Sequence, residues 1–167
     1  MAKVFTYGLT SVEFGDVATD GGVATTFSNK GLTFKDSFEI ASADADVQEF
    51  QSEENDEPEI SISTQGKKIY KFQLMNPGVD ELLYFLGGVV VAGPPKVWQA
   101  PGQTPVNEKS IKITPKKGHI LTITRALIVA KESGKYSKTG LAMLDITITV
   151  MKPTKALEPS MTKTEQA

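Results

Sequence analysis

The sequence predicts a mainly β protein: an antiparallel β-sandwich or barrel-like domain with one short flanking α-helix. Apolar and polar side chains alternate with a period of two through much of the 167-residue chain, which is the pattern of half-buried strands. Two such runs, at about 120–129 and 141–151, are also rich in β-branched residues. We place this single domain at residues 1–151 and expect residues 152–167 to form a flexible tail, because that segment is polar and contains proline.

The first expected hairpin lies in the N-terminal half of the chain. Residues 32–40 alternate as a strand that leads into a long acidic loop at about 41–58. Residues 60–63 alternate again, a turn-like TQGK sequence follows, and an apolar strand returns at 70–74. We therefore expect the last two segments to pair as a hairpin, in which Gly66 can supply a positive φ if the turn needs one.

One helix is predicted at about 77–87. Pro77 stands near its start, where a missing N–H costs little, and acidic side chains follow in the first turn. Gly87 and Gly88 come where a left-handed C-terminal cap belongs. A helix this short does not persist alone, so we expect it to dock on a sheet. The expected apolar stripe consists of Val79, Leu82, Leu83 and Leu86.

The strongest strands, at about 120–129 and 141–151, are expected to pair as a long antiparallel hairpin. The connection between them, residues 131–140, is polar and cationic. Between the helix and this hairpin, residues 93–105 contain four prolines, which favour a surface excursion that carries Trp98.

The charges of the chain are divided between one segment and the rest. Ten of the 20 acidic residues lie between Asp36 and Gly66, a stretch without Lys or Arg, whereas all 18 basic residues lie elsewhere. Carboxylates at this density repel one another and favour an extended, solvated segment until a partner of opposite charge meets it. The division therefore indicates an acidic assembly arm on a basic body, and the partner that we expect is another copy of the chain.

Several kinds of site are excluded or lack support in the sequence. There is no cysteine, which excludes disulfides and thiolate metal sites, and no apolar run has the roughly 20 residues of a membrane span. Asp44 begins a segment that departs from the calcium-binding EF-hand loop at key ligand positions. His119 is the only imidazole, and neither Ser110 nor Ser133 stands in a nucleophile-elbow sequence. We therefore expect no enzymatic activity, no cofactor and no metal site.

The order of the elements resembles that of a known family. A strand that begins at Gly31 leads into the acidic connection, a strand hairpin follows at 59–74, a short helix ends in Leu-Gly-Gly, and a terminal hairpin closes the domain. In this order, over roughly 1–151, the chain resembles the tail tube (major tail) proteins of long-tailed bacteriophages. These proteins share their architecture with the tube protein of type VI secretion systems.

The resemblance implies a structural protein of the virion tail, assembled in the bacterial host cytoplasm, with no membrane anchor. Such subunits self-assemble into rings, here expected to be hexameric homo-oligomers, which stack into a hollow tube for genome ejection. Double-stranded DNA would pass through the tube without specific binding, and further partners would be the tape measure, terminator and baseplate or tip proteins. The long loop between the early strands reaches a neighbouring subunit or ring, and that role would fall to about 41–58.

The candidate interface pairs the acidic segment with the basic connection of the last hairpin, because opposite charges on identical subunits favour head-to-tail contacts. The main alternative is a ligand-binding β-sandwich module of the carbohydrate or adhesin type, for which Trp98, Tyr84 and Tyr136 offer a few aromatic side chains. A small hydrolase that uses His119 is a third hypothesis. The candidate interface residues are Asp44, Asp46, Glu49, Phe50, Glu53, Glu54, Asp56, Glu57, Lys131, Lys135 and Lys138.

Overall fold

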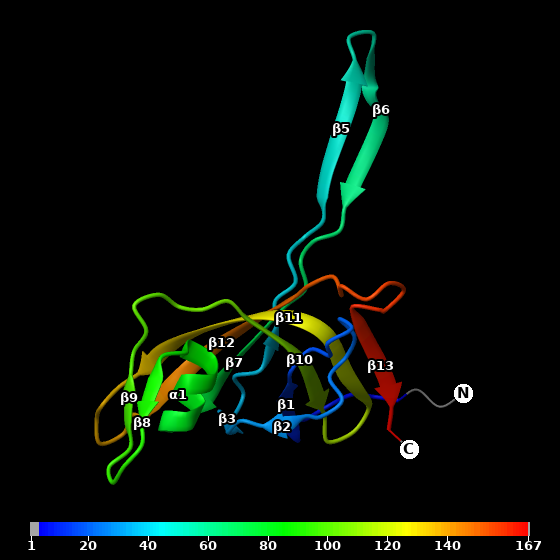
Figure 1. Cartoon of the computed structure of the whole chain (residues 1–167). Coiled ribbons are helices and arrows are strands. Elements are labelled where there is room, and N and C mark those ends of the chain that lie inside the picture. The colour runs from blue at the N-terminus through cyan, green and yellow to red at the C-terminus, as the bar shows by residue number, and fades with distance from the viewer. Residues whose placement is uncertain (1–3, 167) are drawn as a thin grey trace.

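The protein is a strongly curved antiparallel sheet from which one long hairpin projects (Figure 1). The structure is a computed structural model that describes residues 4–166. Strands and a single short helix make up the described elements, so the predicted mainly β class is confirmed. The elements are β1 (Ser11–Gly15), β2 (Ser28–Asn29), β3 (Leu32–Thr33), β4 (Glu39–Ile40), β5 (Asp46–Ser52), β6 (Asn55–Thr64), β7 (Ile69–Met75), α1 (Val79–Leu86), β8 (Val89–Val91), β9 (Val97–Gln99), β10 (Asn107–Thr114), β11 (His119–Gly134), β12 (Ala142–Val150) and β13 (Met161–Glu165).

The main sheet curls until its two edges are joined by one short piece of chain. Its strand order is β2-β1-β10-β11-β12-β7-β3, and only Lys30 and Gly31 separate β2 from β3 in the sequence. One chain segment therefore pairs with β1 at one end and with β7 at the other, which gives the sheet its barrel-like shape. The strand expected at 32–40 is broken into β3 and β4, both paired with β7, around Asp36, which has a φ of 58°.

The long strand β11 connects the two halves of the sheet. Its second half pairs with β12 from Ala126↔Val150 to Gly134↔Ala142, which confirms the predicted terminal hairpin. Its first half pairs with β10 on one side and with β13 on the other. The alternating burial along β11 and β12 places one face of both strands in the core, as their period-two pattern predicts.

The sequence does not predict β1 and β10, although both strands supply core residues. Each strand alternates only briefly, and charged residues interrupt the apolar pattern. In the structure Glu13 of β1 lies opposite Lys112 of β10, with 3.9 Å between the carboxylate oxygen and Nζ. The buried core consists of Val12, Phe14, Tyr70, Phe72, Leu74, Phe85, Ile111, Ile113, Leu121, Ile123, Ala126, Ile128, Ala130, Leu144, Ile146 and Ile148.

The predicted helix is confirmed as α1, but its buried face differs from the expected stripe. Phe85 is its most buried residue and meets the ring of Phe14 edge-on at 5.2 Å, whereas Leu83 is 38% exposed. The Gly87 N–H donates to the Leu83 carbonyl oxygen, and the Gly87 carbonyl accepts a bond of 2.8 Å from Trp98 Nε1. Trp98, in the proline-rich segment, therefore caps the C-terminal end of the helix.

The acidic segment is not a loop, and the hairpin expected between 60–63 and 70–74 is wrong. β6 pairs with β5, so most of the acidic segment forms its own hairpin, while β7 pairs with β12 in the main sheet. β7 pairs with β12 because its apolar side chains then lie in the core next to those of β12. Beside the polar strand β6 these side chains would stay exposed to water. Three buried residues of β7 lie opposite three of β12: Tyr70 and Ile148, Phe72 and Ile146, Leu74 and Leu144.

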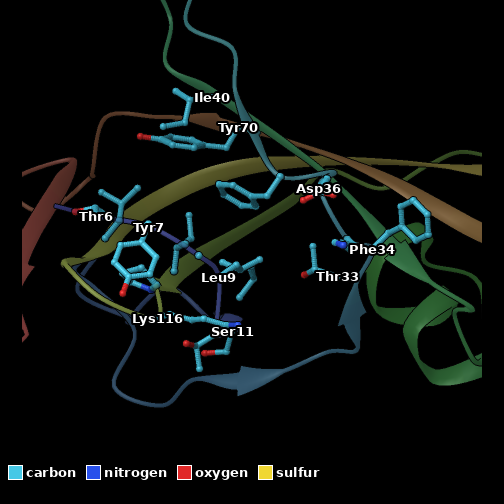
Figure 2. A pocket seen from close by; sticks show the side chains of 18 of the residues that line it. Thr6, Tyr7, Leu9, Ser11, Thr33, Phe34, Asp36, Ile40, Tyr70 and Lys116 are labelled. Carbon is cyan, nitrogen blue, oxygen red and sulfur yellow. The ribbon is translucent and has the colours of Figure 1, made fainter.

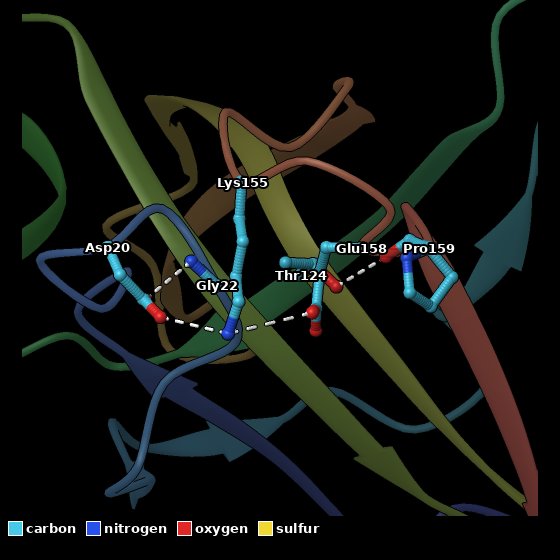
Figure 3. A network of polar contacts seen from close by, with 6 residues as sticks. All are labelled: Asp20, Gly22, Thr124, Lys155, Glu158 and Pro159. Carbon is cyan, nitrogen blue, oxygen red and sulfur yellow. Dashed lines mark hydrogen bonds and ion pairs between the residues drawn. The ribbon is translucent and has the colours of Figure 1, made fainter.

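The C-terminal segment is also more ordered than the flexible tail expected at 152–167. Residues 161–165 form β13, which extends the sheet beside β11. Figure 3 shows how the preceding turn is held: Lys155 Nζ lies 2.8 Å from an Asp20 carboxylate oxygen, and Thr124 Oγ1 donates to the Pro159 carbonyl at 2.7 Å. Composition misses this element because its order comes from pairing with a core strand, not from an apolar pattern of its own.

Candidate functional site

The hairpin of β5 and β6, which we call the arm (residues 46–64), projects away from the sheet (Figure 1). All of its residues except the half-buried Ser52 are exposed. Seven of the candidate interface residues lie along it, six acidic residues and Phe50. Asp44 lies just before the arm, in the segment that leads out from the sheet. The acidic candidates on the arm are Asp46, Glu49, Glu53, Glu54, Asp56 and Glu57.

The arm has one apolar face that nothing covers in the single chain. Residues directly opposite each other in an antiparallel pair point to the same side of the ribbon. Phe50 lies opposite Ile60, and Gln48 lies opposite Ile62, so three large apolar side chains share one face. Phe50 is 54% exposed, Ile60 57% and Ile62 51%. A two-stranded ribbon that shows such a face to water is marginally stable, so the arm has the properties of a segment that a partner covers.

The acidic groups of the arm are not neutralised within the chain. The ion pairs among the described residues 4–166 all lie on the body, and none of them includes a carboxylate of the arm. Glu53 and Glu54 occupy the turn at the tip, and Asp56 and Glu57 follow on β6. The tip is therefore the most negative part of the arm, and it is available to a cationic partner.

Two close backbone contacts hold the base of the arm. The Ala41 N–H donates to the Ile69 carbonyl at 2.8 Å, and the Ala43 N–H donates to the Lys67 carbonyl at 2.9 Å. A Cβ atom on Gly66 would lie only 2.0 Å from the carbonyl oxygen of Ala43. Gly66 does not have the positive φ that its place in a turn suggests. Glycine is needed there because two backbones pass each other closely.

The three candidate lysines lie elsewhere and do not meet the arm of the same chain. Lys131 is on β11, with Nζ 4.0 Å from a carboxylate oxygen of Asp145. Lys135 and Lys138 are exposed in the connection from β11 to β12. Figure 1 shows the arm pointing away from the body, which carries this connection. Any contact between these lysines and an arm would therefore join two copies of the chain.

A groove that the sequence does not reveal opens on the body, with a volume of about 810 Å³ (Figure 2). Its walls are the N-terminal segment 6–12 and the segment 31–40, which carries β3 and β4. Its floor includes Tyr70 and Leu121 of the core. Leu32 and Ile40 on the wall are 71% and 68% exposed. The sequence signal for this surface is the alternation at 32–40: Leu32 and Ile40 stay exposed beside the groove, whereas Phe38 packs on the core rings of Tyr70 and Phe72.

The rim of the groove is cationic. Lys35, Lys116 and Lys163 line it, each is exposed, and none is in an ion pair with a described residue. Asp36 is the one carboxylate among the described lining residues. These lysines are far apart in the sequence, and the pairing of β13 with β11 brings Lys163 opposite Leu121. The body therefore presents an apolar groove with a positive rim.

His119 lies in the wall of the same groove and has a structural partner. Its Nδ1 lies 3.2 Å from Thr6 Oγ1, and its backbone N–H donates to the same oxygen. Ser110 is completely buried, where Oγ accepts from the Ala24 N–H and donates to the Thr124 carbonyl. The Ser133 hydroxyl donates to Asp145. Neither of the two serines considered as nucleophiles is hydrogen-bonded to the imidazole.

Two of the titrating groups with a shifted pKa, Asp16 and Tyr84, lie together in one cluster on the body. Burial, with a smaller contribution from the charge of Asp16, raises the pKa of Tyr84 to about 12. The ammonium groups of Lys30 and Lys109 lie 4.7 and 5.1 Å from the centre of its ring. The hydrogen bond and charge of Lys109 lower the pKa of Asp16. This cluster joins β10, α1 and the segment after β1, and its geometry is that of a packing contact.

Three further observations bear on the class of the protein. Within residues 4–166, no three carboxylate or imidazole side chains converge in a group that could hold a metal ion. The described part of the chain contains no helix of the length and apolarity needed to cross a bilayer. The sequence matches no protein-family model and no curated protein.

Proposed function

We propose that the protein is a structural subunit of a phage tail tube, which self-assembles into hexameric rings that stack into a hollow tube for the viral genome. The observation that carries the proposal is the arm, an exposed acidic ribbon with an apolar face that only another molecule can cover. Its place between early strands matches the long intersubunit loop that the resemblance to tail tube proteins implies. The remaining partners of the proposal are the tape measure, terminator and baseplate or tip proteins.

The electrostatics of the chain support self-association in particular. The arm carries uncompensated carboxylates, and the body carries uncompensated lysines. Two different complementary surfaces on one chain produce a head-to-tail contact, which closes into a ring or continues as a stack. Such an assembly also neutralises much of the positive charge, so DNA can pass without the counterion release that drives tight binding.

A ligand-binding β-sandwich module remains the second candidate, and the groove favours it. Its volume of about 810 Å³ lies within the usual range for small-molecule sites. The aromatic side chains named for a carbohydrate site do not gather there, however. Trp98 Nε1 is bonded to Gly87, Tyr84 is packed beneath two lysines, and Tyr136 stands alone at 97% exposure.

Negative-stain electron microscopy of the purified chain over a range of concentrations tests the proposal. We expect hexameric rings or tubes with a central channel at high concentration and low salt. A protein that stays monomeric in light scattering at every concentration and salt would contradict self-assembly. A monomer whose Trp98 fluorescence changes on addition of glycans would support the ligand-binding module instead.

A further inference from the structure

We infer that the arm of one copy docks into the groove of a second copy, with its apolar face toward the floor of the groove and its acidic tip at the lysine rim. This inference rests on the proposed self-assembly and names the surface that receives the arm. The groove then takes the place of the basic β11–β12 connection as the partner of the arm.

An arm that occupies the groove has to come from a second copy, because the arm projects away from the body of its own chain. Ile40 lines the groove and ends β4, and the chain leaves the body immediately after it. The bonds from Ala41 to Ile69 and from Ala43 to Lys67 then hold the base of the arm extended. The arm consequently projects away from the main sheet (Figure 1).

The two surfaces match in polarity. Phe50, Ile60 and Ile62 form the uncovered face of the arm. The groove offers exposed apolar side chains on its wall and the partly covered ring of Phe38 within it. Burying these side chains against each other removes apolar surface from water on both partners, which is the main favourable contribution to association.

The charges match as well. Lys35, Lys116 and Lys163 stand at the rim without carboxylate partners, while the tip of the arm carries Glu53 and Glu54 without cationic partners. Opposite charges at the edge of an apolar contact speed the encounter and fix its orientation more than they increase affinity. Of the three candidate lysines, by contrast, Lys131 on β11 already contacts Asp145.

The edge of β1 beside the groove is only partly paired, with Ser11 half-buried and Val12 buried. β2 pairs with β1 only at Glu13 and Phe14. Among the described residues, Ser11 and Val12 of β1 therefore have β10 on one side and no strand on the other, and both line the groove. An edge of the arriving arm can pair there, as strands added to open sheet edges do.

Photo-cross-linking from the arm tests the inference directly. Phe50 is replaced by the photoreactive aromatic residue benzoylphenylalanine in the full chain, and heavy-isotope and light copies are mixed before assembly and irradiation. We expect mixed-isotope cross-links to residues 6–12, 31–40 or 113–121. The matched control carries the same probe at Tyr136 in the β11–β12 connection and should not cross-link to residues 46–64.

The outcomes separate this inference from the proposed function. Suppose that rings or tubes form and that the Phe50 probe cross-links to residues 131–140, or the Tyr136 probe to the arm. This result would contradict the docking of the arm in the groove and leave the proposed self-assembly intact. Groove cross-links in small oligomers without rings or tubes would support the docking and contradict the tube. A monomer without mixed cross-links would overturn both.

Charge reversal provides a second, independent measurement. We expect the triple variant Lys35→Glu, Lys116→Glu and Lys163→Glu to raise the concentration needed for assembly by about tenfold. The reason is that it removes three ion pairs at the rim, each of which contributes modestly to the affinity. Glu53→Lys, Glu54→Lys and Glu57→Lys in the arm should restore assembly of that variant. The control Lys131→Glu, Lys135→Glu and Lys138→Glu should leave assembly unchanged; if it blocks assembly and the rim variant does not, the groove is not the receptor.

Discussion

Ser110 shows how a single polar side chain holds an irregular point of the sheet. The register between β10 and β11 shifts between Lys109 and Ile111, so the ladder is interrupted at this residue. Ser110 Oγ donates to the Thr124 carbonyl at 2.6 Å and accepts from the Ala24 N–H at 3.0 Å. Its side chain thus satisfies the Thr124 carbonyl, which lies in the shifted part of the ladder, and the N–H of Ala24 in the segment between β1 and β2, which is a structural role and not that of a nucleophile.

We expect Ser110→Ala to lower the free energy of unfolding by about 2 kcal/mol, because it leaves a buried N–H and a buried carbonyl without a partner. Urea unfolding followed by circular dichroism measures this change. The exposed Ser63→Ala variant on the arm is the control and should change stability by less than about 0.5 kcal/mol. Equal stability of the two variants would show that water or a local shift replaces the bonds of Ser110.

Among the elements, the arm depends on a glycine at its base, because two backbone segments pass each other closely at Gly66. The two chain segments that lead to and from the arm, one through Ala43 and the other through Gly66, leave the sheet side by side. They are hydrogen-bonded to each other at the base of the arm. The close approach aims the ribbon away from the body, and the rest of the arm makes its contacts mainly within itself. The direction of the arm is therefore decided by a few residues at its base.

We expect Gly66→Ala to loosen the arm and leave the body intact, because its Cβ would overlap the Ala43 carbonyl oxygen. Amide hydrogen exchange should become roughly tenfold faster in β5 and β6, while exchange in β11 and β12 stays unchanged. Gly102→Ala is the matched control, since a Cβ there meets no atom within 4 Å. Unchanged protection of the arm in Gly66→Ala would contradict the role assigned to this contact.

For the whole molecule, the separation of charge is the property that couples one chain to the next. The tip carries four carboxylates that find no cation within the described chain, at Glu53, Glu54, Asp56 and Glu57. Exposed charges of this kind act over about one Debye length and weaken as salt is added. The proposed assembly should consequently be most stable at low ionic strength.

We expect the variant Glu53→Gln, Glu54→Gln, Asp56→Asn and Glu57→Gln to assemble only at a several-fold higher concentration and with a flatter dependence on salt. Light scattering at a series of salt concentrations measures both effects. Glu132→Gln with Glu165→Gln removes exposed carboxylates outside the arm and should behave like the unmodified chain. A steep salt dependence that survives in the tip variant would show that the tip does not form the contact.

Much of the fold was predictable because alternation and end signals act locally. The terminal hairpin of β11 and β12 follows from its apolar, β-branched runs, and α1 follows from Pro77 and the glycines behind it. β13 and the pairing in the arm were not predictable in this way, since β13 has little apolar alternation of its own and the alternation at 60–63 does not show which strand lies beside it. The groove was missed for a related reason: its lysines come from three separate segments of the chain.

The order of the residues along the chain predicts that the protein is mainly β, that one short helix interrupts the strands, and that an acidic segment is opposed by a basic remainder. Composition and periodicity carry this information because they depend on each side chain and its near neighbours. The pairing of β6 with β5 instead of β7, and the position of Lys35, Lys116 and Lys163 around an apolar groove, become visible only in the folded chain. A period of two shows which face of a strand each side chain is on. Which strand pairs with which depends on the burial of side chains over the whole sheet.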